Sequence, residues 1–210
     1  MKLELRSQDL TLVTFCITLV ATLAVLLKGE AAPALDSFLL DGLHDWLPGG
    51  LRAGLLKVYL LSGVGFTGLL VAASLAYLAL NRWWRDLGLL VLSTGGILAI
   101  VDLVLKPLFD RSRPPEKLLV VEGHSFPSGH AAGSIAFYFA MVTILAAHYP
   151  HLRRPLVVTA SAWITLVWMS TLVARAHWPS DLLAGGAVGT AWLTVCLALW
   201  RSRRTAKAEG

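Results

Sequence analysis

Charged residues are scarce in this chain, because Asp, Glu, Lys and Arg together make up only 15% of its 210 residues. A soluble domain usually contains about 25% of such residues, since its surface has to be hydrated. Hydrophobic residues make up 56% of the sequence, and many lie in long uncharged runs that are typical of membrane-spanning segments. The composition therefore argues against a soluble protein and predicts a single transmembrane domain over residues 1–210.

Cysteine is scarcer still, since Cys16 and Cys196 each stand alone inside an apolar run. Neither a disulfide framework nor a zinc site is indicated. The acidic residues near the polar motifs described below are too scattered to form a metal-binding carboxylate cluster: Asp110, Glu116, Glu122 and Asp181. We therefore expect no metal and no cofactor. The net charge of +5 comes mostly from loop arginines without a nucleic-acid-binding motif, so we expect no nucleic-acid partner.

Six apolar segments come close to the roughly 20 residues that a helix needs to cross the hydrocarbon core. They are approximately Leu10–Leu27, Val58–Leu80, Leu87–Leu105, Ala131–Ala147, Leu156–Val173 and Leu182–Trp200. This pattern predicts an all-α integral membrane protein, a six-transmembrane helix bundle. The first segment could be a signal peptide, because Lys2 and Arg6 precede it. Its apolar run is long for that role, and we expect it to stay as a membrane anchor.

The loops between these segments indicate an orientation. With a cytoplasmic N-terminus, ten of the 18 basic residues fall inside and eight outside. Four of the outer eight belong to motifs that we interpret below as phosphate-binding, and without them the bias is clear. We expect both termini and a basic tail over 201–210 to be cytoplasmic. A bacterial inner membrane is our expectation, and a eukaryotic internal membrane is the alternative.

Residues 28–57 form the predicted outer loop between the first two spans. Within it, apolar side chains recur at helical spacing among acidic ones: Leu35, Phe38, Leu39, Leu43, Trp46 and Leu47 among Asp36, Asp41 and Asp45. This spacing predicts an amphipathic helix that lies in the membrane interface, or one that caps the bundle.

Polar residues are concentrated in three clusters, which cover residues 106–114, 124–130 and 175–181. With six spans, all three clusters emerge on the same side, opposite the termini. Distant parts of the chain therefore converge on one membrane face, as a single active site would require.

The first cluster brings together Lys106, Arg111 and Arg113. The planar fork of arginine suits phosphate oxygens, and lysine adds a point charge. Two other interpretations stay open. The cations could belong to a solvated loop, and Lys106 could simply pair with Asp102, four residues earlier on the same helix.

The second cluster is Pro127-Ser128-Gly129-His130, at the start of an apolar helix. Ser128 can cap that helix, which is the structural alternative. A helix N-terminus also attracts anions, and Gly129 lets a ligand approach its backbone closely. His130 lies in the first turn beside such an anion, where it can serve as a general acid.

The third cluster places His177 four residues before Asp181. If both lie at the start of the last span, the carboxylate can accept the Nδ1 proton and leave Nε2 free to attack. The alternative is a hydrogen-bonded pair that only closes the start of the helix.

Together these motifs resemble the type 2 phosphatidic acid phosphatase family, whose pattern is K-x6-RP, then PSGH, then SR-x5-H-x3-D. The order, the spacing and the six-span layout agree over roughly residues 58–200. The matching residues are Lys106, Arg113 and Pro114, then Pro127 through His130, then His177 and Asp181.

One position departs from this pattern. The family's third arginine would fall at residue 171, where this chain has Thr171, and an arginine occurs at 175 instead. Residues 171 and 175 would share a helix face, so we hypothesise that Arg175 reaches the same phosphate. The competing interpretation is that the site has lost one phosphate contact.

The resemblance implies a mechanism without a metal. His177 attacks phosphorus and forms a phosphohistidine, Asp181 orients it, and His130 protonates the leaving oxygen and later activates water. Several groups would hold the phosphoryl oxygens: Lys106, Arg113, Ser128, the Gly129 backbone and Arg175, with Arg111 as a further candidate.

The implied substrate is a membrane lipid phosphate or pyrophosphate. The family covers phosphatidic acid, phosphatidylglycerol phosphate, undecaprenyl pyrophosphate and lipid A phosphates, and the sequence selects none of them. Two alternatives are a lipid phosphotransferase that uses the same phosphohistidine and a non-catalytic lipid-phosphate binder or transporter. Hydrolysis is favoured because binding alone needs no nucleophile with an orienting carboxylate.

Overall fold

The computed structural model describes residues 6–27, 34–119 and 122–205. Within these ranges the protein is helical and contains no strand. The expectations for Lys2, for residues 28–33 of the outer loop and for residues 206–210 of the basic tail lie outside the described residues.

The helices follow one another in the order α1 (Ser7–Leu27), α2 (Ala34–Trp46), α3 (Gly49–Leu61), α4 (Val64–Leu80), α5 (Trp84–Leu98), a π-helical stretch η1 (Ala99–Leu105), α6 (Lys106–Phe109), α7 (Gly129–His148), a 3-10 turn η2 (Pro150–Leu152), α8 (Arg153–Val173) and α9 (Pro179–Thr205).

Five helical segments among the described residues are long and apolar enough to cross a membrane. They correspond to the predicted first, third, fourth, fifth and sixth spans, with ends that differ by a few residues. The third runs without a break through α5, η1 and α6, over 26 residues. The prediction of helical spans is therefore confirmed for these five segments.

The predicted second span, Val58–Leu80, is not one straight helix. The chain bends by 52° between α3 and α4, so a sixth span exists only if this pair counts as one. Ser62 and Gly63 form the break. The Ser62 hydroxyl donates to the Tyr59 carbonyl at 3.0 Å, and Thr67 donates to the Ser62 carbonyl at 3.1 Å. These bonds satisfy backbone groups that the interrupted helix leaves free.

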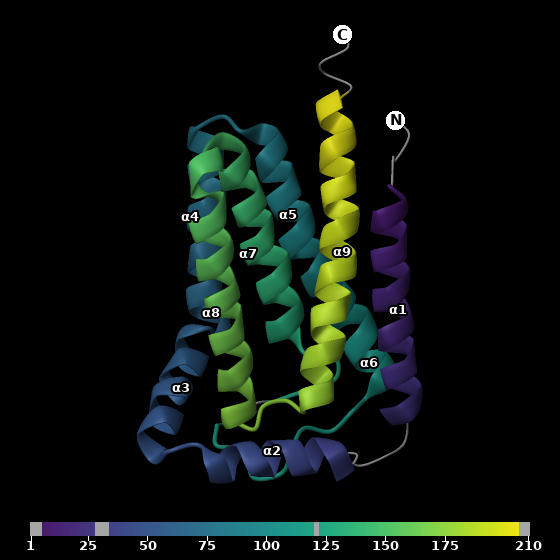
Figure 1. The fold of residues 1–210 in the computed structure, drawn as a ribbon, viewed down its shortest axis with the longest axis vertical. Helices are drawn as coiled ribbons and strands as arrows, with labels where there is room; N and C mark the ends of the chain where they lie inside the picture. Colours follow the sequence, from purple (N-terminus) through teal and green to yellow (C-terminus); the bar gives the residue numbers. More distant parts are fainter. Residues whose placement is uncertain (1–5, 28–33, 120–121, 206–210) are drawn as a thin grey trace.

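The long helices stand side by side in a bundle, and α2 lies across one end of it (Figure 1). The start of α1 and the end of α9 lie at the opposite end. α2 buries Leu40 fully but leaves Phe38 and Trp46 74% and 79% exposed. It therefore caps the bundle and also presents an apolar face outward, which combines the two predicted alternatives.

α7 lies at the centre of the bundle and packs against α5, α8 and α9. α7 and α9 can approach closely because α9 has glycines where it faces α7. A Cβ at Gly185 would lie 2.4 Å from the Ser128 carbonyl oxygen, and one at Gly189 would lie 2.6 Å from that of Ala132. This packing fixes the start of α7, which carries the second polar cluster, against the start of α9, which carries the third.

Candidate active site

His177 lies between α8 and α9 and is 2% exposed. Its Nδ1 is 2.9 Å from the Ser125 carbonyl oxygen and 3.5 Å from Oδ2 of Asp181. Both neighbours accept hydrogen bonds, so the proton belongs on Nδ1 and Nε2 keeps its lone pair. Asp181 was the predicted acceptor. The nearer one is the Ser125 carbonyl, which the sequence pattern gives no sign of.

Asp181 is fully buried in the first turn of α9. Its Oδ2 accepts a hydrogen bond from the Trp178 backbone at 2.8 Å. Its own carbonyl accepts one from the Ser128 backbone at 3.0 Å. The residue that faces Nδ1 of His177 is thereby bonded directly to the start of α7.

His130 lies in the first turn of α7, as predicted. Its ring centre is 6.0 Å from that of His177, in an edge-to-face arrangement. The structure therefore brings together two histidines that are 47 positions apart in the sequence. Aromatic rings in contact have centres about 4.5–7 Å apart, so the two imidazoles pack directly against each other.

Arg113 lies directly beside His177. Its Nη1 is 3.4 Å from Nε2 of His177 and donates to the Ala176 carbonyl at 2.6 Å. The rest of the guanidinium is held by the carbonyls of Glu122 and Gly123. Backbone acceptors thus fix the arginine fork next to the nitrogen that would attack phosphorus.

The Lys106 side chain reaches from α6 to the start of α7. A Cβ added to Gly129 would lie 3.6 Å from its Nζ. It also forms the ion pair with Asp102 that the helical spacing suggested, at 2.6 Å. Ser128 caps α7 by accepting from the Ala131 backbone at 3.3 Å. The ion pair of Lys106 and the helix cap of Ser128, which were the structural alternatives to phosphate binding, are therefore both present. Both residues still border the N-terminus of α7.

Arg111 has carboxylate partners. Its side chain is 5% exposed, its Nη2 donates to Asp36 at 2.7 Å, and its Nη1 donates to Asp181 at 2.5 Å. The guanidinium also lies over the Trp178 ring, 5.5 Å from the ring centre. These contacts give no support to the predicted phosphate-binding role of Arg111.

Arg175 does not share a helix face with Thr171, because α8 ends at Val173. The backbone of Arg175 is left-handed, with φ 52°, and its side chain pairs with Asp41 at 2.6 Å. Thr171 is fully buried and donates to the Trp168 carbonyl of its own helix. The geometric reason for assigning Arg175 to the phosphate was therefore wrong.

Two residues near the site escaped the sequence patterns. Tyr59 on α3 packs its ring 5.4 Å from that of His130. Asp36 on α2 is buried and bonded to Arg111, and the sequence had indicated only that it belongs to an amphipathic helix. No local motif could reveal either, since each meets the site only through tertiary packing.

The surroundings of His177 favour its neutral form. Burial lowers the pKa of His177 below its ordinary value of 6.5. Asp181 works against this shift, whereas the charges of Arg113 and Lys106 add to it. Burial also lowers the pKa of Arg113, although an arginine stays charged at neutral pH. The site therefore combines a neutral imidazole with fixed cations.

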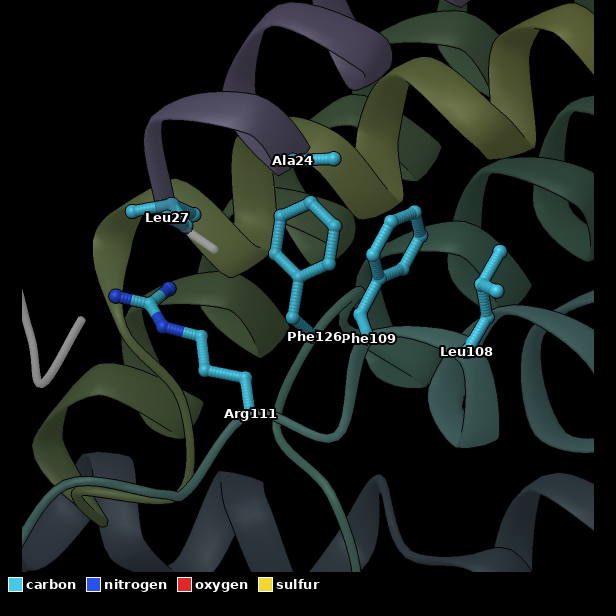
Figure 2. Close-up of a pocket in the computed structure, with 6 residues that line it drawn as sticks. All are labelled: Ala24, Leu27, Leu108, Phe109, Arg111 and Phe126. Carbon is cyan, nitrogen blue, oxygen red and sulfur yellow. The ribbon is translucent and has the colours of Figure 1, made fainter. Parts of the chain in front are cut away.

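A cavity of about 230 Å³ lies beside Arg111, between α1 and α6 with its following loops (Figure 2). Its lining consists of Ala24, Leu27, Leu108, Phe109, Arg111 and Phe126. Five of these six residues are apolar; both terminal nitrogens of Arg111 are bonded to carboxylates, and its Nε has no hydrogen-bond partner in the part of the chain that the structure describes.

Metal-binding clusters of three or more His, Cys, Asp or Glu side chains do not occur among the described residues. The described groups at the site are two histidines, two cations and the N-terminus of α7.

Comparison with known proteins agrees with this arrangement. The model of the PAP2 superfamily matches residues 83–205. A crystal structure described as the first transmembrane PAP2 type phosphatidylglycerolphosphate phosphatase, from Bacillus subtilis, superposes with a TM-score of 0.78 at 22% sequence identity, over 95% of this chain and 98% of that one. No curated protein sequence matches the chain.

The structural likeness establishes a shared membrane-embedded helical fold, and the family match extends over more than half of the sequence. The resemblance seen in the three motifs is thereby confirmed. This chain is an integral membrane protein that belongs to the PAP2 superfamily.

Proposed function

We propose that the protein hydrolyses a phosphomonoester or pyrophosphate on a membrane lipid, through a phosphohistidine and without a metal. One observation carries this proposal: Nε2 of His177 lies 3.4 Å from Nη1 of Arg113, its Nδ1 faces two hydrogen-bond acceptors, and the His130 ring packs against it. An attacking nitrogen, a cation for the phosphoryl oxygens and an acid for the leaving group therefore share one small space.

In the first step, the lone pair on Nε2 of His177 forms a bond to phosphorus as the bond to the lipid oxygen breaks. The lipid oxygen leaves with a proton from His130. Positive charge develops on the His177 ring, where the Nδ1 proton is held by Ser125 and Asp181. Arg113 and Lys106 stabilise the negative charge on the phosphoryl oxygens.

In the second step, water attacks the phosphohistidine. His130, now deprotonated, takes a proton from that water, the N–P bond breaks, and His177 recovers its lone pair. Inorganic phosphate leaves, and His130 is protonated again for the next cycle.

The proposed phosphate-binding set is narrower than the one suggested by the sequence. It contains Lys106, Arg113, Ser128 and the Gly129 backbone, because these border the start of α7 or the nucleophile. Arg111 and Arg175 are left out, because their ion pairs direct them to Asp36, Asp181 and Asp41 and not to the start of α7 or to Nε2 of His177.

We further propose six spans, with α3 and α4 together as one, both termini cytoplasmic, and the site on the periplasmic face of a bacterial inner membrane. The start of α1 and the end of α9 lie at the same end of the bundle, opposite α2, which supports an even number of spans, and the loop charges support the cytoplasmic side (Figure 1). Reporter fusions at the two termini test it, and a periplasmic signal from either would refute it.

Phosphate release by the purified protein in detergent tests the function. The panel contains phosphatidic acid, phosphatidylglycerol phosphate, undecaprenyl pyrophosphate and a lipid A phosphate, with EDTA present throughout. We expect release from at least one lipid, and none from His177→Ala. An added lipid acceptor separates hydrolysis from phosphotransfer, because a transferase would give a phosphorylated acceptor in place of inorganic phosphate. Tight lipid binding without turnover would indicate a binder.

A further inference from the structure

A buried chain of charged groups leads from α2 to the proposed nucleophile. Asp36 on α2 accepts a hydrogen bond from Nη2 of Arg111 at 2.7 Å, and Nη1 of Arg111 donates to Asp181 at 2.5 Å. The other carboxylate oxygen of Asp181 faces Nδ1 of His177 at 3.5 Å. The side chains of Asp36, Arg111 and Asp181 are only 5%, 5% and 0% exposed.

Asp36 is fixed in this place by more than one bond. The backbone N–H of Ser180 donates to its Oδ1 at 3.0 Å, and the Ser180 hydroxyl donates to its Oδ2. Ser180 also accepts from Arg111 at 2.8 Å. Asp36 therefore joins α2 to the first turn of α9, immediately beside Asp181, in one defined geometry.

The charges of Asp36, Arg111 and Asp181 do not cancel. Two carboxylates, Asp36 and Asp181, share one guanidinium, so the group has a net charge of −1. Without Asp36 it would be neutral, since Arg111 would balance Asp181 alone. Buried charges act on one another strongly, because little water separates them. The surplus negative charge therefore bears on the His177 ring, which becomes positive when it attacks phosphorus.

We propose that Asp36 is a positioning residue for phosphoryl transfer: by engaging Arg111 it holds the Asp181 carboxylate in place and keeps its charge available to His177. This inference rests on the function proposed above. It means that α2, the helix that lies across the end of the bundle, contributes a residue to the site as well as capping the bundle. The charged or titratable groups that surround His177 are Asp181 on α9, Arg113 in the loop after α6, Lys106 on α6 and His130 on α7, with Arg111 and Asp36 behind Asp181.

The test compares Asp36→Asn with a matched control, Asp41→Asn. Both residues lie on α2, and both bind an arginine, but the partner of Asp41 is Arg175, which does not touch Asp181. We expect Asp36→Asn to lower kcat roughly tenfold with little change in KM. A tenfold loss is about the effect on the rate of removing a unit charge that lies about 10 Å from the developing imidazolium, at an effective dielectric constant of about 20. Asp41→Asn should keep the kcat of the wild type.

A second readout does not depend on activity. NMR of the protein labelled with ¹⁵N-histidine follows the titration of His177, with His177→Asn to assign the signal. Loss of the negative charge at Asp36 makes the imidazolium harder to form, so the midpoint should move to lower pH in Asp36→Asn and stay in Asp41→Asn. The double variant Asp36→Asn with Arg111→Gln restores the net charge of −1, and its midpoint should return toward that of the wild type.

Equal behaviour of the two single variants in both readouts would overturn the proposal, because it would mean that Asp36 only anchors α2. A double variant whose midpoint stays at the position of Asp36→Asn would overturn it as well. Should the wild type release phosphate from no lipid, the proposed function fails, and the NMR titration still decides whether Asp36 controls the charge at His177.

Discussion

Replacing Gly185 by alanine should misalign the catalytic groups without touching any of them. The new Cβ would lie 2.4 Å from the Ser128 carbonyl oxygen and 3.0 Å from Cβ of Ala131. Non-bonded carbon contacts are comfortable at about 3.5 Å, so the start of α7 has to move away from α9 by about 1 Å. The obstacle is backbone, which cannot rotate aside as a flexible side chain would.

That displacement acts on the geometry of the reaction. The first turn of α7 carries His130, whereas His177 and Asp181 belong to the other side of the contact. The hydrogen bond from the Ser128 backbone to the Asp181 carbonyl, 3.0 Å long, would be stretched by the same movement. A misplacement of about 1 Å can cost about a hundredfold in rate, and we expect kcat of Gly185→Ala to fall by that order.

The assay is steady-state phosphate release in detergent, beside a thermal unfolding measurement. Overpacking costs about 1–3 kcal/mol, so the melting temperature should fall, yet the protein should remain folded at the assay temperature. Gly133→Ala is the matched control, because it lies on α7 with nothing within 4 Å of the new Cβ. It should retain full activity. A Gly185→Ala protein as active as this control would refute the link between helix contact and catalysis.

Three further predictions concern the cations and the nucleophile. Arg175→Ala should retain activity within about threefold, because the partner of Arg175 is Asp41, whose side chain is 58% exposed, so that water screens the pair. A loss of more than about a hundredfold, measured by phosphate release, would restore the phosphate-binding hypothesis. Arg113→Lys should lower kcat/KM by at least about tenfold, since one ammonium cannot replace a fork held by three carbonyls, and an unchanged kcat/KM would contradict this. Burial lowers the pKa of His177, which must be neutral to attack, so its NMR titration should occur below pH 6.5. Activity should therefore be retained as the pH falls through 6.5. A titration midpoint above 6.5 would contradict the geometry.

The membrane helices were largely predictable, because the physical requirement for them is local. A helix in lipid needs about 20 apolar residues, and such runs are visible one at a time along the chain. The second span shows the limit of this reasoning. Its apolar run continues on both sides of Ser62 and Gly63, and hydropathy does not register a bend of 52° that is stabilised by two hydroxyl groups.

The positions of His130, His177, Lys106 and Arg113 were predictable as well, because each lies in a motif with fixed spacing. The partners of Arg111 and Arg175 were not. Asp36 is 75 positions from Arg111, and Asp41 is 134 positions from Arg175. A guanidinium binds a carboxylate and a phosphate with the same geometry, so residue type alone cannot tell which one it meets. Only the docking of α2 against the ends of α8 and α9 decides this.

In the proposed site, other positive groups can balance the charge of the substrate phosphate although residue 171 is a threonine. A phosphomonoester has a charge of about −1.5 to −2 near neutral pH. Arg113 and Lys106 supply two positive charges, and the N-terminus of α7 adds the equivalent of about half a charge. Asp102 offsets part of the charge of Lys106, but its side chain is 46% exposed, so water screens that contribution. In the proposed site, Arg113, Lys106 and the helix N-terminus therefore come close to balancing the charge of a single phosphate group without an arginine at position 171.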